Sequence, residues 1–189
     1  HLYTLQRPAT VRNREMKQVS LLEALGLKVQ KRLIVDSMMN YGMYYPGEGE
    51  IGTGVVKPIV RVEFKNSADN RLGMPLPMGN VKVYQRDKSG SVQMLGEDRI
   101  EHTPRDETLS LAIGRSFDVV AERKRLSYQR LTDRSFRETF QVEVRNRKEV
   151  AETVYVLERH YGDWKVTDHN SEWTRPDSTT LQFVVNLKA

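Results

Sequence analysis

The densest group of residues able to carry acid–base or metal chemistry lies between positions 96 and 102. Glu97, Asp98 and Glu101 supply carboxylates and His102 supplies an imidazole, which are the ligand types that metals and general acids or bases use. If the run is a strand, Glu97 and Glu101 point to one face while Asp98 and His102 point to the other. No face then collects three ligands, so we expect a solvated, salt-bridged strand and no metal site.

Other catalytic patterns fail on composition or context. The chain has no cysteine, which excludes disulfides, thiolate zinc sites and a cysteine nucleophile. Residues 47–52 satisfy G-x-G-x-x-G by letter, but they open no helix and carry two glutamates that would repel a pyrophosphate. Ser116 follows Gly114-Arg115 without the second glycine of a nucleophile elbow. We therefore predict no catalytic residue and no cofactor.

A Tyr-, Met- and Gly-rich segment at 37–56 differs from the rest of the chain. It holds five of the twelve glycines, and loops of this length in compact domains are uncommon and often functional. Its aromatic and thioether side chains suit a contact surface for a ligand or partner, although a mobile insertion that covers a sheet edge has the same composition. The candidate binding residues here are Tyr41, Met43, Tyr44 and Tyr45.

Positive charge is concentrated between Arg123 and Lys148. This stretch has nine Lys or Arg against three Asp or Glu, which gives it a net charge of +6. The rest of the chain carries −1, so the formal net charge of the whole chain is +5. The candidate basic patch is Arg123, Lys124, Arg125 and Arg130. Recognition of an acidic polymer is one interpretation, and a solvated strand face protected against edge pairing is the other. No RNA-binding aromatic motif or helix-turn-helix pattern is present, so nucleic acid is not an expected partner.

The two tryptophans have different settings. Trp164 follows Gly162-Asp163 and precedes Val166, which favours a place in or at the edge of a core. Trp173 stands between Glu172 and Thr174, so either packing or an exposed stacking surface for a sugar or a partner is consistent with it. Trp173 is therefore a further candidate binding residue.

These residues must be positioned by strands, because two-residue alternation runs through nearly the whole chain. Val60, Val62 and Phe64 alternate with charged residues, and Phe140 and Val142 alternate with the polar residues Gln141 and Glu143. The predicted strands are 2–7, 15–22, 27–36, 57–66, 80–86, 91–96, 107–113, 117–131, 136–146, 150–160, 164–169 and 179–188. Short strands at this spacing predict an all-β protein built of antiparallel β-sandwiches, immunoglobulin-like in general architecture, with few or no helices.

Length and charge set the expected organisation. A chain of 189 residues can bury a core without a metal or disulfide, and no apolar run approaches the ~20 residues of a membrane helix. The charge balance shifts near residue 118. We predict a sandwich domain at 1–118 that carries the loop at 37–56, and a smaller sandwich at 119–189.

Several runs taken together resemble a known bacterial family. They are Tyr3-Thr4-Leu5, Pro8-Ala9-Thr10-Val11, Glu15-Met16-Lys17-Gln18-Val19-Ser20-Leu21-Leu22, Val62-Glu63-Phe64-Lys65-Asn66, Leu72-Gly73-Met74-Pro75-Leu76-Pro77-Met78-Gly79-Asn80-Val81, Leu95-Gly96-Glu97-Asp98-Arg99-Ile100, His102-Thr103-Pro104, Gly114-Arg115-Ser116-Phe117-Asp118-Val119 and Gly162-Asp163-Trp164. The set resembles the bacterial domain of unknown function 4139, the C-terminal domain of exported, mucoidy-inhibitor-like proteins. The resemblance implies an all-β fold and a periplasmic or secreted location, and it carries no catalytic residues. It also implies one more strand after the 179–188 strand, whose absence would leave the smaller sandwich with an edge open to pairing.

The sequence therefore predicts a non-catalytic, extracytoplasmic binding or scaffolding module of bacteria. Its partner is expected to be a protein or polysaccharide of the cell envelope, with no membrane insertion and with sheet-edge pairing as one mode of contact. The alternative is an enzyme or binding protein that acts on cell-envelope or acidic polysaccharide, with a carboxylate pair drawn from Glu97, Asp98 and Glu101.

Overall fold

The structure is a computed structural model that describes residues 8–19, 26–37, 53–87 and 89–189. Its strands are β1 (Gln30–Asp36), β2 (Gly54–Val56), β3 (Ile59–Lys65), β4 (Gly79–Arg86), β5 (Val92–Ile100), β6 (Thr108–Arg115), β7 (Val119–Thr132), β8 (Ser135–Asn146), β9 (Glu152–Arg159), β10 (Trp173–Thr174) and β11 (Thr180–Leu187). The described residues hold one short 3₁₀ turn, η1 (Ala68–Asn70), and no α-helix. The all-β class is confirmed, and no described helix has the length and apolar character needed to cross a membrane.

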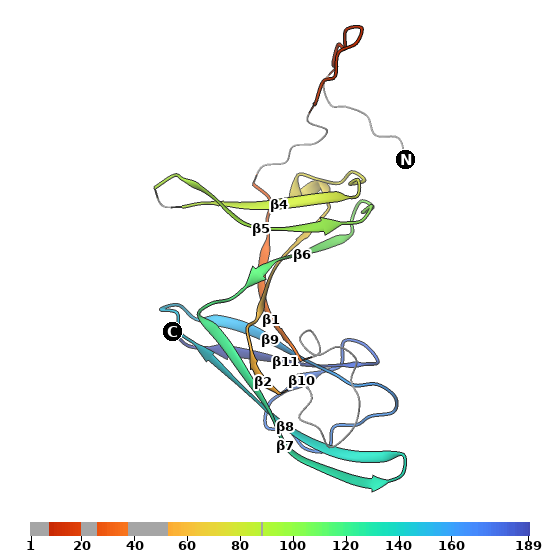
Figure 1. The fold of residues 1–189 in the computed structure, drawn as a ribbon, viewed down its shortest axis with the longest axis vertical. Helices are drawn as coiled ribbons and strands as arrows, with labels where there is room; N and C mark the ends of the chain where they lie inside the picture. The colour runs from red at the N-terminus through yellow and green to blue at the C-terminus, as the bar shows by residue number, and fades with distance from the viewer. Residues whose placement is uncertain (1–7, 20–25, 38–52, 88) are drawn as a thin grey trace.

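The strands of the described residues form three sheets (Figure 1). The largest has the order β10-β11-β9-β1-β3-β6, the second has β2-β7-β8, and the third is the β4–β5 hairpin. Every strand pair is antiparallel except β1 with β9, which run parallel. The first two sheets face each other as a sandwich in the lower part of Figure 1, and the hairpin lies beside β6 in the upper part.

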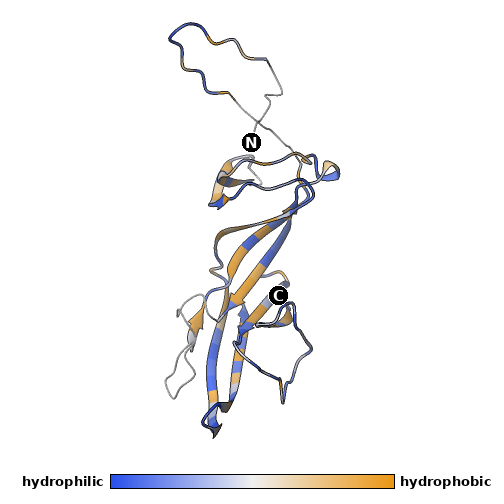
Figure 2. Ribbon diagram, turned by 90° about the vertical axis from the view of Figure 1, so that its right-hand side faces the viewer, coloured by the Kyte–Doolittle hydropathy of each residue, from blue (hydrophilic) through white to orange (hydrophobic). Residues whose placement is uncertain are grey.

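The main core lies between the two facing sheets. Leu33 and Val35 of β1 and Val154 and Val156 of β9 contribute one side, and these residues are at most 3% exposed. The other side comes from β2 and β7, with Val56, Val119 and Ala121. The core residues of β1, β7 and β9 are two residues apart along each strand, and Figure 2 shows the resulting alternation of apolar and polar residues along the strands.

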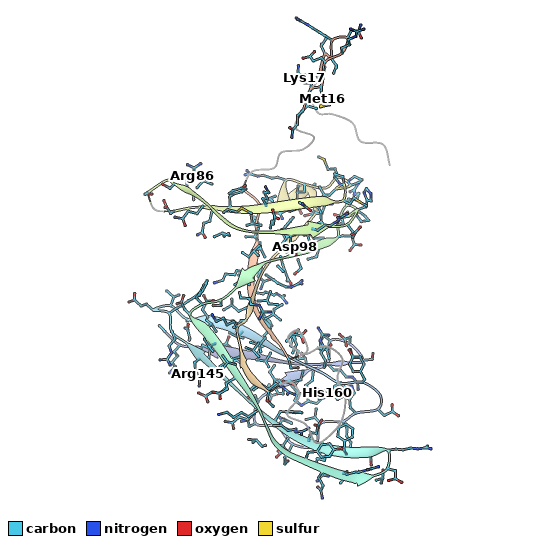
Figure 3. All side chains as sticks on the ribbon, in the orientation of Figure 1. Met16, Lys17, Arg86, Asp98, Arg145 and His160 are labelled. Carbon is cyan, nitrogen blue, oxygen red and sulfur yellow. The ribbon has the colours of Figure 1, made fainter. Side chains whose placement is uncertain are left out.

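The upper part depends on one close approach between β5 and β6. Gly96 lies so near Ile113 that a Cβ on Gly96 would stand 2.1 Å from the Ile113 carbonyl oxygen. Ile113 is the extra residue in the β3–β6 ladder, where the register shifts between Val60 and Arg61. Asp98, two residues beyond Gly96, accepts a hydrogen bond from the backbone N–H of Ala112 at 2.7 Å. A close approach at Gly96 and a side-chain hydrogen bond from Asp98, which is labelled in Figure 3, thus replace a regular backbone ladder between β5 and β6.

A second polar contact fixes the loop that follows β3. Asn66 is fully buried, and its Nδ2 donates to the carbonyl oxygens of Met74 and Pro104, both at 2.8 Å. Its Oδ1 accepts from the N–H of Gly73 at 3.0 Å, where φ is +86°. Each polar atom of this side chain therefore has a partner, which is what a buried amide requires.

Most expected strands are present, and the differences have physical causes. The run 164–169 alternates but forms no strand, because side-chain contacts of Trp164 rather than a backbone ladder hold it. Residues 15–19 are also not a strand, and 20–22 and 2–7 lie outside the described residues. The short strands β2 and β10 were not expected.

The expected division at residue 118 does not match the sheets. β1 pairs with β9, from Leu33 opposite Val154 to Asp36 opposite Leu157, and β2 pairs with β7. Strands from both sides of position 118 therefore share each sheet of the sandwich. Such pairings join residues far apart in sequence, and neither charge nor composition encodes them.

Candidate functional site

The apolar core ends in a buried ion pair at one end of the sandwich. On β9 the inward positions run Val154, Val156 and then Glu158, and on β7 they run Val119, Ala121 and then Arg123. The Arg123 guanidinium meets the Glu158 carboxylate in a forked arrangement, with Nε 2.9 Å from Oε1 and the terminal nitrogen 2.8 Å from Oε2. The side chains are 5% and 7% exposed, so two charge-assisted hydrogen bonds offset the cost of burying both charges.

Aromatic rings extend this polar layer onto the β7–β8 hairpin. The Arg123 guanidinium lies 3.6 Å from the centre of the Phe140 ring. Arg125 pairs with Glu138 at 3.0 Å and lies 5.2 Å from the Tyr128 ring, which in turn stacks on Phe136 at 5.6 Å. The inner face of the hairpin therefore alternates charged pairs and rings, each held by its neighbours.

A hollow of about 610 Å³ runs along this part of β7. Its described lining is Thr53, Gly54, Glu122, Arg123, Lys124, Arg125, Leu126, Ser127 and Tyr128. A hollow on one face of a strand would be lined by alternate residues, whereas every residue from 122 to 128 lines this one. The hollow therefore follows the edge of β7, beyond the point where β2 begins at Gly54 opposite Arg123.

His160 borders the same layer from the end of β9 (Figure 3). Burial lowers the pKa of its imidazole, and the positive charge of Arg123 lowers it further, while Glu158 and Glu138 oppose the shift. The ring lies 5.3 Å from Trp164, whose Nε1 donates to the Ser178 carbonyl at 2.9 Å. The Arg175 guanidinium lies over the same indole ring, 4.2 Å from the ring centre.

The lowered pKa of His160 predicts a stability change in acid. The unfolded chain binds the proton near the ordinary histidine value of about 6.5, and the folded chain binds it only at lower pH. The free energy of unfolding should therefore fall as the pH drops from 7 through 6.5 towards the folded pKa. Urea denaturation at pH 7 and pH 5 measures this fall, and H160Q should make it smaller. An equal fall in both chains would show that other groups cause it.

The candidate basic residues do not form one exposed surface. Arg123 and Arg125 lie in the nearly buried ion pairs described above. Lys124 and Arg130 are exposed, and they pair with Glu122 at 3.0 Å and Asp133 at 3.1 Å. Two of the partners, Glu122 and Glu158, lie outside the segment 123–148. A count of charges within that segment alone therefore overstated its positive electrostatic potential.

The other predicted residues have mixed outcomes. Tyr41, Met43, Tyr44 and Tyr45 lie outside the described residues. Trp173 is half-buried in β10, opposite Phe183 and edge-on to the His169 ring at 6.3 Å.

The acidic segment follows the predicted alternation only within β5, which ends at Ile100, and Glu101 and His102 both lie exposed beyond the strand. Glu97 and Glu101 are exposed, while Asp98 turns towards β6 and His102 accepts from the Met78 N–H at 3.3 Å. In the described ranges no three His, Asp or Glu side chains gather in a way that could hold a metal ion.

Sequence reasoning missed Glu158, Glu138 and His160. A signal was present, because Glu158 continues the inward parity of Val154 and Val156, and Arg123 continues that of Val119 and Ala121. Two charges of opposite sign that interrupt two apolar faces predict a buried pair, provided the two strands are known to face each other. That last condition is not readable from one sequence.

Comparison of the chain with protein-family models, with curated proteins and with solved structures gave no match.

Proposed function

We propose that this chain is a non-catalytic binding or scaffolding module that works outside the bacterial cytoplasm. The observation that carries the proposal is the end of the sandwich, where a hollow follows the β7 edge above a layer of paired charges and rings. The resemblance to an exported bacterial family supports the location and supplies no activity.

The pairing of charges favours binding over catalysis. A general acid or nucleophile needs a carboxylate that can reach a substrate. Glu158 and Glu138 are instead 7% exposed, and each is engaged with an arginine within about 3 Å. The paired side chains beside Tyr128 are already held in place, so they lose little conformational freedom when a partner binds. Such a surface suits binding in one defined orientation.

The segment 38–52 is the second part of the proposed contact surface. Thr53, the described residue that follows it, lines the hollow, and Ser37, which precedes it, donates its N–H to the Leu157 carbonyl on β9 at 3.3 Å. The two described residues that flank the segment therefore lie near the paired charges. We extend the contact surface to Met43 and Tyr44 because of their residue types.

A matched pair of double variants tests the proposal. M43S/Y44S should lose most of the capture of envelope components from a bacterial envelope extract. Y84S/M94S removes the same residue types from the β4–β5 hairpin, where Tyr84 and Met94 are 55% and 49% exposed, and it should retain capture. Equal capture by both variants would contradict the role of the loop.

Columns of heparin and alginate extend the test to acidic polysaccharide. Because four of the candidate cations are already paired, we expect elution below physiological salt. Retention that persists well above it would favour an acidic polymer as the partner and would contradict the scaffolding proposal in its present form.

A further inference from the structure

His160 stands where the layer of paired charges meets the chain segment that leaves β9. It is two residues beyond Glu158, and this spacing along a strand puts both side chains on the same, inward face. The His160 N–H donates to the Thr179 carbonyl at 2.7 Å, which continues the pairing of β9 with β11 by one residue. The half-buried imidazole is therefore directed into the end of the sandwich, beside side chains whose charges are nearly buried.

The surroundings of this ring suit the neutral imidazole. The charged groups that face it are Glu158 of β9, Glu138 of β8 and Arg123 of β7. Both carboxylates are already paired with an arginine of β7, at 2.8 Å and 3.0 Å. Within the part of the chain that the structure describes, neither ring nitrogen makes a hydrogen bond. A protonated imidazole has two N–H donors, so this position offers its charge neither an acceptor nor water on all sides.

The His160 ring also supports Trp164. The two ring centres are 5.3 Å apart, while the indole Nε1 donates to the Ser178 carbonyl and the Arg175 guanidinium lies over the indole. These contacts fasten residues 161–172, which form no strand and contain only two half-buried residues, to the turn before β11. Segments with little buried surface and no backbone ladder open at the lowest cost in free energy. A charge on the imidazole would also repel the guanidinium on the far side of the same indole.

We propose that His160 is a pH-sensitive switch that controls the docking of residues 161–172. When the ring binds a proton, it leaves the end of the sandwich for water, and Trp164 loses its support. The strand pairs stay formed, because the core residues Leu33, Val154 and Val156 carry no titratable group. The inference goes beyond the proposed function, since it concerns a change in the chain itself.

The switch also reaches the hollow along β7. Arg123 lines that hollow and is held by Glu158, so departure of the neighbouring imidazole admits water to this pair. A partner that binds there at neutral pH should be held more weakly in acid, because the surface it meets is less fixed. This consequence, unlike the switch, rests on the proposed function.

The burial of the imidazole sets the direction of the response. Burial lowers the pKa of His160 below its ordinary value of about 6.5, so the ring is neutral at pH 7 and the segment is released only below pH 6.5. NMR titration of the full chain between pH 7 and pH 5 follows the His160 ring and the Trp164 indole N–H together. After correction for the intrinsic effect of pH, the indole N–H should lose about tenfold in protection against exchange. This loss should share its midpoint with the His160 ring, while the amides of β9 and β11 stay protected.

Substitutions at two histidines of the same region provide the controls. H160Q and H160F place a neutral side chain beside Trp164, so both should keep the indole N–H protected at pH 5. H160K carries a charge at either pH and should lose that protection already at pH 7. H169Q removes an exposed histidine within residues 161–172 and should respond to pH as the unsubstituted chain does.

The outcomes separate the switch from the proposed function. Indole protection that persists at pH 5 with His160 protonated, or that is lost equally in H160Q and H160F, would overturn the switch. Loss of β9 and β11 protection at the same midpoint would overturn it as well, because acid would then unfold the sandwich as a whole. Loss of indole protection with unchanged capture of envelope components supports the switch and removes only its effect on the hollow.

Discussion

E158L should lower the free energy of unfolding by about 3–5 kcal/mol, because it leaves the Arg123 guanidinium buried without its carboxylate. R123M should cost a similar amount by leaving Glu158 alone and by removing the contact with Phe140. Urea denaturation followed by circular dichroism measures both. These are the largest effects we expect from any single substitution in the sandwich.

The double variant tests whether each single substitution lowers the free energy of unfolding because it leaves one buried charge unpaired. R123M/E158L replaces both charges by apolar groups of similar size, so it should be close to the unsubstituted chain in stability. D133N, in the exposed pair with Arg130, should leave the denaturation midpoint unchanged. If the two single effects simply add in the double variant, the pair is not the coupled unit described here.

G96V should destabilise the upper part of the molecule by about 3 kcal/mol, the upper end of what overpacking costs. A Cβ at Gly96 meets backbone atoms of Ile113 at 2.1–2.9 Å, and backbone cannot turn aside as a flexible side chain can. Hydrogen exchange should show faster opening of β5 and β6, while β9 and β11 in the sandwich stay protected.

Gly79 provides the control on the same hairpin. No atom lies within 4 Å of the position that its Cβ would occupy, so G79A should change stability by less than about 0.5 kcal/mol. If G96V and G79A behave alike, the close approach of β5 to β6 does not support the upper part.

The strands were predictable where alternation is long. β3, β8 and β11 were expected within two residues of their bounds, because each buries one face and leaves the other wet. Alternation wrongly predicted a strand at 164–169. There the Trp164 indole donates a hydrogen bond to the Ser178 carbonyl and packs under the Arg175 guanidinium, and these side-chain contacts replace a backbone ladder. It also could not show that β1 pairs with β9, since nothing local records that contact.

The site was less predictable than the fold. The sequence marked Arg123 and Arg125 as surface cations, but both are turned inward by the parity of β7. Their partners Glu158 and Glu138 lie 35 and 13 residues away along the chain. The facing of the two sheets brings Arg123 to Glu158, whereas the pairing of β7 with β8 brings Arg125 to Glu138. Together the two pairs neutralise the two cations that the sequence assigned to a basic patch.

The most direct test of the central claim is a search for turnover by the intact chain. Isolated bacterial envelope glycans, incubated with the protein and examined by mass spectrometry for released oligosaccharides, should come back unchanged. Release of defined products that disappears in E97Q, D98N or E101Q would contradict a purely binding role and would establish the enzyme alternative.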